Sequence, residues 1–180
     1  NLLGAFVPAA VVGLAAGDWI KARLFGPGPV AAALAAGGAA MIAVEWWRAR
    51  CAAGRSIDAL EAMTLRAAMV IGLAQCLALW PGMSRSMVTI VAALLLGFSP
   101  RAAAEFSFLL ALPTLGSATA YDALEHGRAI LQVSGLSGVA IGFAVSAVVA
   151  WLAIEWLLAW LRRRGLAVFG WYRLVLALAV

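Results

Sequence analysis

Long apolar stretches with few charged residues, separated by short polar or charged connections, run along the whole chain. Crossing a bilayer takes about 20 apolar residues as a helix, and several of these stretches are long enough. The first two flank a Gly-Pro-Gly-Pro turn, and the longest ends at three consecutive arginines. The apolar stretches are residues 2–19, 30–47, 65–79, 87–98, 100–121, 130–161 and 166–180.

The middle region, about residues 65–98, has a different pattern. Its two apolar halves are separated by Pro81 and Gly82. Each half would form roughly 21 Å of helix, which is shorter than the ~30 Å thickness of the hydrocarbon layer. Neither half can span a membrane alone. The region is therefore either one kinked span or a re-entrant hairpin that enters and leaves on the same side.

The distribution of positive charge favours the hairpin. A hairpin places eight basic residues on one side and three on the other, whereas a kinked span gives a nearly even division of five against six. Cytoplasmic loops carry an excess of Lys and Arg, so we predict a re-entrant hairpin whose mouth is cytoplasmic. The eight are Arg48, Arg50, Arg55, Arg66, Arg101 and Arg162 to Arg164, and the three are Lys21, Arg23 and Arg128.

Composition excludes an ordinary soluble globule. Apolar residues make up 66% of the 180 residues and charged residues 12%, and the mean hydropathy is +1.02; soluble domains have roughly 45–50% apolar residues. The basic residues lie at the ends of apolar segments, which indicates membrane orientation and not nucleic-acid binding. We predict an all-α, polytopic membrane domain over residues 1–180, with about five transmembrane helices and one re-entrant hairpin.

The tip of the predicted hairpin carries an arginine, Arg85, where a charged side chain is costly. An arginine at membrane depth costs on the order of 2.5–3.5 kcal/mol, so it needs a compensating partner, and no acidic residue lies near it in sequence. Re-entrant backbone occurs only where protein or a water-filled cavity surrounds it. With Pro81 and Gly82 making the turn, the tip is the expected functional site.

Hydroxyl groups accompany this arginine. A helix that starts near Ser84 to Ser86 presents free N–H groups and the positive end of its dipole to an anion. Thr89 follows Arg85 by four residues and Ser86 by three, so the side chains can share one face. Such a set suits phosphate oxygens. The alternatives are that the serines only cap the helix and that Arg85 pairs with a distant carboxylate.

Several other polar residues have simpler explanations. Gln75, one turn before the break, either faces the site or makes an interhelical hydrogen bond. Glu105 is expected as a first-turn acid near a helix N-terminus, His126 as part of a solvated connection, and Arg173 as a side chain that snorkels to the interface.

The segment from Gln75 to Ser86 (QCLALWPGMSRS), followed by Thr89 and by the sequence AEFSFLLALP at 104–113, strongly resembles the undecaprenyl-diphosphate phosphatase (bacitracin-resistance) family. The similarity extends over the whole chain. It implies half of an inverted-repeat fold in the bacterial inner membrane, and an enzyme that converts undecaprenyl diphosphate to the monophosphate carrier for cell-wall synthesis, giving bacitracin resistance. By matching positions, Arg85 with Ser84, Ser86 and Thr89 would be catalytic, and Pro81, Gly82 and Gln75 would bind substrate.

Two departures from the family pattern affect these expectations. Met87 stands where the family usually has glycine, which changes how closely a substrate or helix can approach. The family's second motif, a Glu-x-x-x-Glu pair with a Ser-Ser-x-Gly-His segment, does not occur in the chain. We therefore expect that an N-terminal part of the family fold precedes these residues.

The missing motif has a chemical consequence. The resemblance implies a divalent cation, Mg²⁺ or Ca²⁺, whose carboxylate ligands are not near the predicted tip. The sequence alone therefore predicts no phosphatase activity for this polypeptide by itself. Its expected partners are a polyprenyl diphosphate and membrane lipids, with no nucleic acid, and a homodimer is left open. Two other functions also remain open at this point: a transporter or flippase with a broken-helix anion site, and a non-catalytic membrane scaffold.

Overall fold

The computed structural model describes residues 1–51 and 56–180, without the side chains of Asp18, Lys21, Cys51, Arg162 and Arg163. The predicted loop arginine Arg55 thus lies outside the described residues. The described part is all-α, and its only β-type contact is an isolated bridge between Ile57 and Phe98. Its helices are α1 (Leu2–Leu24), α2 (Pro27–Cys51), η1 (Leu60–Ala62), α3 (Leu65–Gln75), η2 (Cys76–Leu79), α4 (Arg85–Leu95), α5 (Pro100–Arg164) and α6 (Ala167–Ala179).

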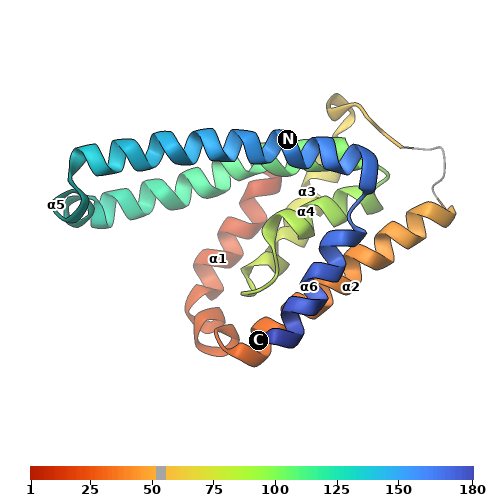
Figure 1. The fold of residues 1–180 in the computed structure, drawn as a ribbon, viewed down its shortest axis with the longest axis horizontal. Helices are drawn as coiled ribbons and strands as arrows, with labels where there is room; N and C mark the ends of the chain where they lie inside the picture. Colours follow the sequence, from red (N-terminus) through yellow and green to blue (C-terminus); the bar gives the residue numbers. More distant parts are fainter. Residues whose placement is uncertain (52–55) are drawn as a thin grey trace.

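The centre of the fold is the helix pair α3 and α4, which is interrupted as the sequence predicts. The short 3-10 helix η2 and a turn separate the two helices, and α3 packs against α4. Helix α1 covers α3, α2 packs on α4 and α6, and α5 begins against α4 (Figure 1). Ile71 of α3, Leu94 of α4 and Leu110 of α5 are fully buried where these helices meet.

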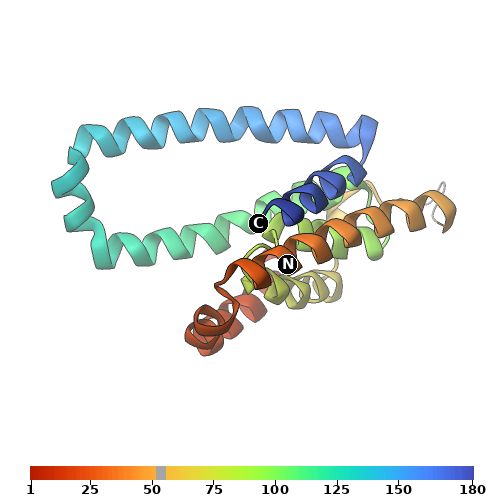
Figure 2. The same ribbon diagram turned by 60° about the horizontal axis from the view of Figure 1, so that its bottom comes forward.

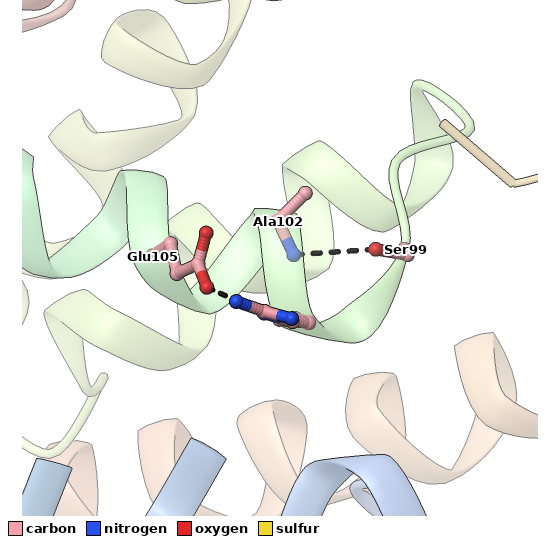
Figure 3. A network of polar contacts seen from close by, with 4 residues as sticks. Ser99, Ala102 and Glu105 are labelled. Carbon is pink, nitrogen blue, oxygen red and sulfur yellow. Dashed lines mark hydrogen bonds and ion pairs between the residues drawn. The ribbon is translucent and has the colours of Figure 1, made fainter. Parts of the chain in front are cut away.

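Side-chain caps begin the three helices around this centre. The hydroxyls of Thr64, Ser84 and Ser99 accept the N–H groups of Ala67, Met87 and Ala102, three residues further on. Figure 3 shows the Ser99 cap, with Glu105 one turn further along α5. The expectation that Glu105 is a first-turn acid is wrong, because the first turn of α5 contains no acidic residue. Glu105 instead accepts from Arg101 Nε at 2.6 Å in an exposed ion pair.

Helix α5 turns back on itself, but later than the polar residues suggest. The segment from Asp122 to Arg128, predicted as a connection, is helical, and His126 lies on its exposed surface. The break falls at Gly135, with φ 65° and ψ 163°. Acidic residues and arginine are compatible with a helix, whereas this backbone conformation strongly favours glycine. Figure 2 shows the two long limbs of α5 joined at their far ends by a short helical segment that crosses from one limb to the other.

Two helices in the described residues are long and apolar enough to cross a membrane, Pro27–Arg50 within α2 and Pro100–Leu161 within α5. The most apolar window of α5 has no buried residue. Along α5, large apolar side chains such as Leu124, Val133 and Phe143 are exposed. An extended apolar surface of this kind fits a membrane protein, in which lipid covers it.

Candidate active site

The turn between η2 and α4 is built by Pro81 and Gly82, as predicted. The N–H of Met83 donates to the carbonyl of Trp80 at 3.0 Å. Gly82 has φ +91°. Proline at the second position and a positive φ at the third are typical of a type II turn. This glycine also presses against α2, because a Cβ at position 82 would lie 2.7 Å from the carbonyl oxygen of Val30.

Ser84 ends the turn and caps α4. Its hydroxyl accepts from the Met87 N–H at 3.3 Å, so the capping interpretation of this serine is confirmed. Arg85 is then the first residue of α4. The guanidinium consequently lies beside the first turn of the helix, where free N–H groups and the helix dipole favour an anion.

Arg85 is half-buried and borders a cavity of about 500 Å³. Its Nη1 makes a long, weak contact of 3.5 Å with the carbonyl of Ser107 on α5. Among the described residues the one ion pair is that of Arg101 with Glu105. The alternative in which Arg85 pairs with a carboxylate therefore finds no partner in the described part of the chain, and most of the hydrogen-bonding capacity of the guanidinium is left for a ligand.

Gln75 faces the same cavity from the end of α3. Its side chain is only 2% exposed. Neither its amide nitrogen nor its amide oxygen has a hydrogen-bond partner among the described residues, so the expected interhelical hydrogen bond is not seen there. An unsatisfied buried amide costs about 1–3 kcal/mol, and a polar ligand in the cavity would remove this cost.

The walls of the large cavity are mainly apolar. Helix α1 supplies one wall, and η2 and the first limb of α5 supply the others. Arg85 and Gln75 are thus polar groups beside the apolar walls from α1 and η2, whereas the α5 wall also carries Thr114, Ser117, Tyr121 and Asp122. Apart from Arg85 and Gln75, the lining consists of Phe6, Ala9, Ala10, Gly13, Leu14, Ala78, Leu79, Thr114, Ser117, Ala118, Tyr121 and Asp122.

The remaining predicted hydroxyls point elsewhere. Ser84 and Ser86 line a second cavity of about 250 Å³, which they share with Arg173 of α6. Thr89 is fully buried and lines neither cavity. Its hydroxyl lies 2.7 Å from that of Ser107, and it contacts the carbonyls of Arg85 and Ser86 at 3.0 and 3.1 Å. The predicted cluster is thus divided among three places. Arg85 borders the large cavity, Ser84 and Ser86 border the smaller one, and Thr89 is buried against Ser107.

Sequence reasoning missed two residues of this site, Ser107 and Arg173. Ser107 lies inside the family-like segment 104–113. Nothing in the sequence around it indicates that it contacts the site. Arg173 was expected to snorkel, but its Nη2 donates to the carbonyl of Gly82 at 2.6 Å. The available signal was a second arginine, inside an apolar stretch, with no acidic residue close in sequence.

The described residues do not fit a divalent cation. They contain no group of three or more His, Cys, Asp or Glu side chains that could hold a metal ion. Hard cations such as Mg²⁺ take several oxygen ligands, usually including carboxylates. The large cavity contains one carboxylate, that of Asp122. We therefore derive no step of the reaction from a metal held by these residues.

An all-α fold with long, exposed apolar helices fits a membrane protein. The family model described as "Bacitracin resistance protein BacA" matches residues 1–179, and the chain belongs to this family. It is 54% identical over 177 residues to an undecaprenyl-diphosphatase of Sorangium cellulosum, covering 98% of this chain and 57% of that protein.

Two other similar proteins are also named undecaprenyl-diphosphatases. An undecaprenyl-diphosphatase of Sphingopyxis alaskensis is 44% identical over 97% of this chain and 64% of its own length. Undecaprenyl-diphosphatase 2 of Rhodospirillum rubrum is 46% identical over 100% of this chain and 64% of its own length. The chain thus spans about three fifths of the length of these curated relatives.

Proposed function

We propose that the protein hydrolyses undecaprenyl diphosphate to undecaprenyl phosphate and phosphate, and that the chain described here provides the diphosphate-binding side of the site. The observation that carries the proposal is the pairing of Arg85, without an acidic partner among the described residues, with the unsatisfied amide of Gln75 in one largely apolar cavity. Family membership and the names of the relatives support the same reaction, and they do not favour a transporter.

The substrate has two chemically different parts, and the cavity has a surface for each. The guanidinium of Arg85 would bind phosphoryl oxygens bidentately and offset the negative charge that builds up as the phosphoanhydride bond breaks. The amide nitrogen of Gln75 would donate to a further oxygen. The apolar walls of α1 and η2 would hold the first isoprene units, since burying apolar surface stabilises by about 25 cal/mol per Å².

Thr89 has an indirect place in this scheme. Its hydroxyl is paired with that of Ser107, whose carbonyl accepts from Arg85. Thr89 would therefore hold the layer against which the guanidinium rests, and would not contact phosphate itself. Ser84 and Ser86 would act at the start of α4, Ser84 by capping it and Ser86 from the smaller cavity.

We also propose a multi-pass protein of the bacterial inner membrane in which α3, η2 and α4 form a re-entrant hairpin open to the cytoplasm. Figure 1 shows the end of α2, the start of α3 and both ends of α5 gathered at one end of the molecule. The Ile57–Phe98 bridge joins the chain before α3 to the chain after α4. Arginines such as Arg48, Arg66 and Arg101 belong to these segments, in agreement with a positively charged cytoplasmic side.

The test is phosphate release from a prenyl diphosphate in the presence of Mg²⁺, using the full-length protein. We expect Arg85→Ala to lower kcat/KM by about 10²–10³-fold, as removal of one charge-stabilising donor does in other enzymes, while membrane insertion is retained. The matched control is Arg101→Ala, which removes an exposed arginine with an ion pair of its own. Unchanged hydrolysis by the Arg85 variant would refute the proposal.

The 180-residue chain is a separate sample in this experiment. Because its described residues supply no metal-ligand cluster, we expect it to bind a non-hydrolysable prenyl diphosphonate without releasing phosphate from the diphosphate. Saturable uptake of intact diphosphate into vesicles would instead support a carrier.

A further inference from the structure

Arg173 reaches from α6 to the turn that precedes α4. Its Nη2 donates to the carbonyl of Gly82 at 2.6 Å, and its side chain is half-buried. We infer that Arg173 is a positioning residue, which holds the 82–83 peptide unit so that the N-terminus of α4 and Arg85 keep the orientation needed for anion binding. The catalytic consequence of this inference rests on the proposed function, whereas the structural clamp does not.

Both polar groups of this one peptide unit are engaged. The carbonyl of Gly82 accepts from Arg173, and the N–H of Met83, at the other end of the same planar peptide, donates to Trp80 at 3.0 Å. A peptide held at both ends cannot rotate about its flanking bonds without breaking a hydrogen bond. Ser84, the cap of α4, and Arg85, its first residue, follow immediately.

The direction of the Gly82 carbonyl matters electrostatically. The start of α4 attracts anions through its free N–H groups. A carbonyl oxygen turned toward the same place would repel a bound phosphate, because it carries a partial negative charge. A hydrogen bond from a charged donor is roughly twice as strong as one between neutral groups. Arg173 therefore keeps the negative end of this dipole pointed toward itself.

Helix packing brings Arg173 within reach. Helices α2 and α6 approach closely through glycines, because a Cβ on Gly38 would lie 2.8 Å from the carbonyl oxygen of Gly170 and a Cβ on Gly170 would lie 2.8 Å from that of Gly38. A Cβ on Gly37 would lie 2.7 Å from Nη2 of Arg173. The absence of a side chain at position 37 thus leaves the space through which the guanidinium crosses α2.

Arg173 and Arg85 have different surroundings, which separates their roles. Arg85 borders the large cavity with Gln75, whereas Arg173 borders the smaller one with Ser84 and Ser86. The Nη2 of Arg173 is already bonded to the backbone, while Arg85 makes only the 3.5 Å contact. Arg173 therefore has a backbone partner at the turn that Arg85 lacks, while the buried Nε of Arg173 has no hydrogen-bond partner among the described residues.

The direct test is amide hydrogen exchange, measured by mass spectrometry on the purified chain in lipid nanodiscs. For Arg173→Ala we expect at least tenfold faster exchange in a peptide covering residues 80–88, with α1 and α3 unchanged. Arg173→Lys, which keeps one charged donor, should restore part of the protection. Arg101→Ala is the matched control and should leave the turn unaffected. Wild-type exchange at residues 80–88 in the Arg173→Ala variant would overturn the inference.

A second variant keeps the test decisive if Arg173→Ala does not fold. A Cβ at position 37 would lie 2.7 Å from Cε of Met87 as well as from Nη2 of Arg173, so Gly37→Ala is made in a Met87→Ala background, where it retains the arginine but displaces its guanidinium. Gly28→Ala in the same background is its control on the same helix, since nothing lies within 4 Å of a Cβ there. Faster exchange at residues 80–88 in the Gly37 variant alone supports the clamp. Equal exchange in the two glycine variants contradicts it.

A kinetic measurement separates this inference from the proposed function. In the full-length protein, Arg173→Ala should lower kcat at least tenfold more than it changes KM for a prenyl diphosphate, and Arg173→Lys should recover part of kcat. A change in KM alone would contradict the positioning role. If the wild-type protein releases no phosphate, the proposed function fails, and the exchange experiment still decides whether Arg173 holds the turn.

Discussion

At the residue scale, the site combines one charged group ready for a ligand with polar groups that have fixed roles. Arg85 and Gln75 border the large cavity without strong partners among the described residues. Thr89 and Ser107 are fully buried and bonded to each other. Polar groups of the first kind cost stability and are expected where a ligand binds, whereas groups of the second kind contribute to the fold. Substitutions should therefore separate the two kinds.

Replacing Gln75 with leucine should weaken substrate binding without weakening the fold. The change removes a buried amide that has no partner among the described residues, so we expect unchanged or slightly higher thermal stability in detergent. Losing one hydrogen bond of about 1–1.5 kcal/mol to the diphosphate should raise KM roughly five- to tenfold. Wild-type KM together with lower stability would indicate that Gln75 is only a packing residue.

Replacing Thr89 with valine should, in contrast, weaken the fold. The variant leaves the Ser107 hydroxyl without the partner that it has at 2.7 Å, at a cost of about 1–2 kcal/mol. Adding Ser107→Ala should cost less than the two single changes summed, by roughly 1 kcal/mol, because the pair is coupled. Thermal unfolding of the four proteins of the double-mutant cycle measures this coupling, and strict additivity would show that the hydroxyls act independently.

At the element scale, the sequence predicts helices more reliably than the places where they turn. The break at Pro81 and Gly82 was predictable because both residues have strong local preferences. The turn at Gly135 was not, because polarity at residues 122–128 suggested a connection while the backbone turns where a glycine permits a positive φ. Similarly, Arg85 could be identified from the free-energy cost of placing a charged side chain in a membrane. The contact of Arg173 with the same turn could not be predicted, because it depends on the close packing of α2 and α6.

Two glycines with the same backbone angle provide a test of how the turn is packed. Gly82 and Gly97 both have φ +91°, but a Cβ on Gly82 would lie 2.7 Å from the carbonyl oxygen of Val30, whereas nothing lies within 4 Å of one on Gly97. Gly97→Ala should therefore cost about 1 kcal/mol through backbone strain alone. Gly82→Ala should cost a further 1–3 kcal/mol through overpacking. Equal losses of thermal stability would show that the contact with α2 is loose.

At the scale of the whole molecule, the proposed topology depends on which ends of the helices share a side of the membrane. The backbone bridge between Ile57 and Phe98 joins the segments that flank the α3–α4 hairpin. Arg128 lies near the middle of α5, seven residues before the break at Gly135. A single kinked span would separate the two flanks across the bilayer by about 30 Å. In that case the bridge could not form.

Cysteine labelling distinguishes the two topologies. In a background with Cys51→Ser and Cys76→Ala, Asp58→Cys and Leu96→Cys place thiols at exposed positions on the two flanks of the hairpin, and Arg128→Cys places one at an exposed position on α5. We expect a membrane-impermeant maleimide to leave the two flanking cysteines of intact cells unlabelled and to label the cysteine at position 128. In inside-out vesicles the pattern should reverse. Labelling of the two flanking positions from opposite sides would show that α3 and α4 together cross the bilayer, and the arginine at the turn would then lie in a kinked span and not at the tip of a hairpin.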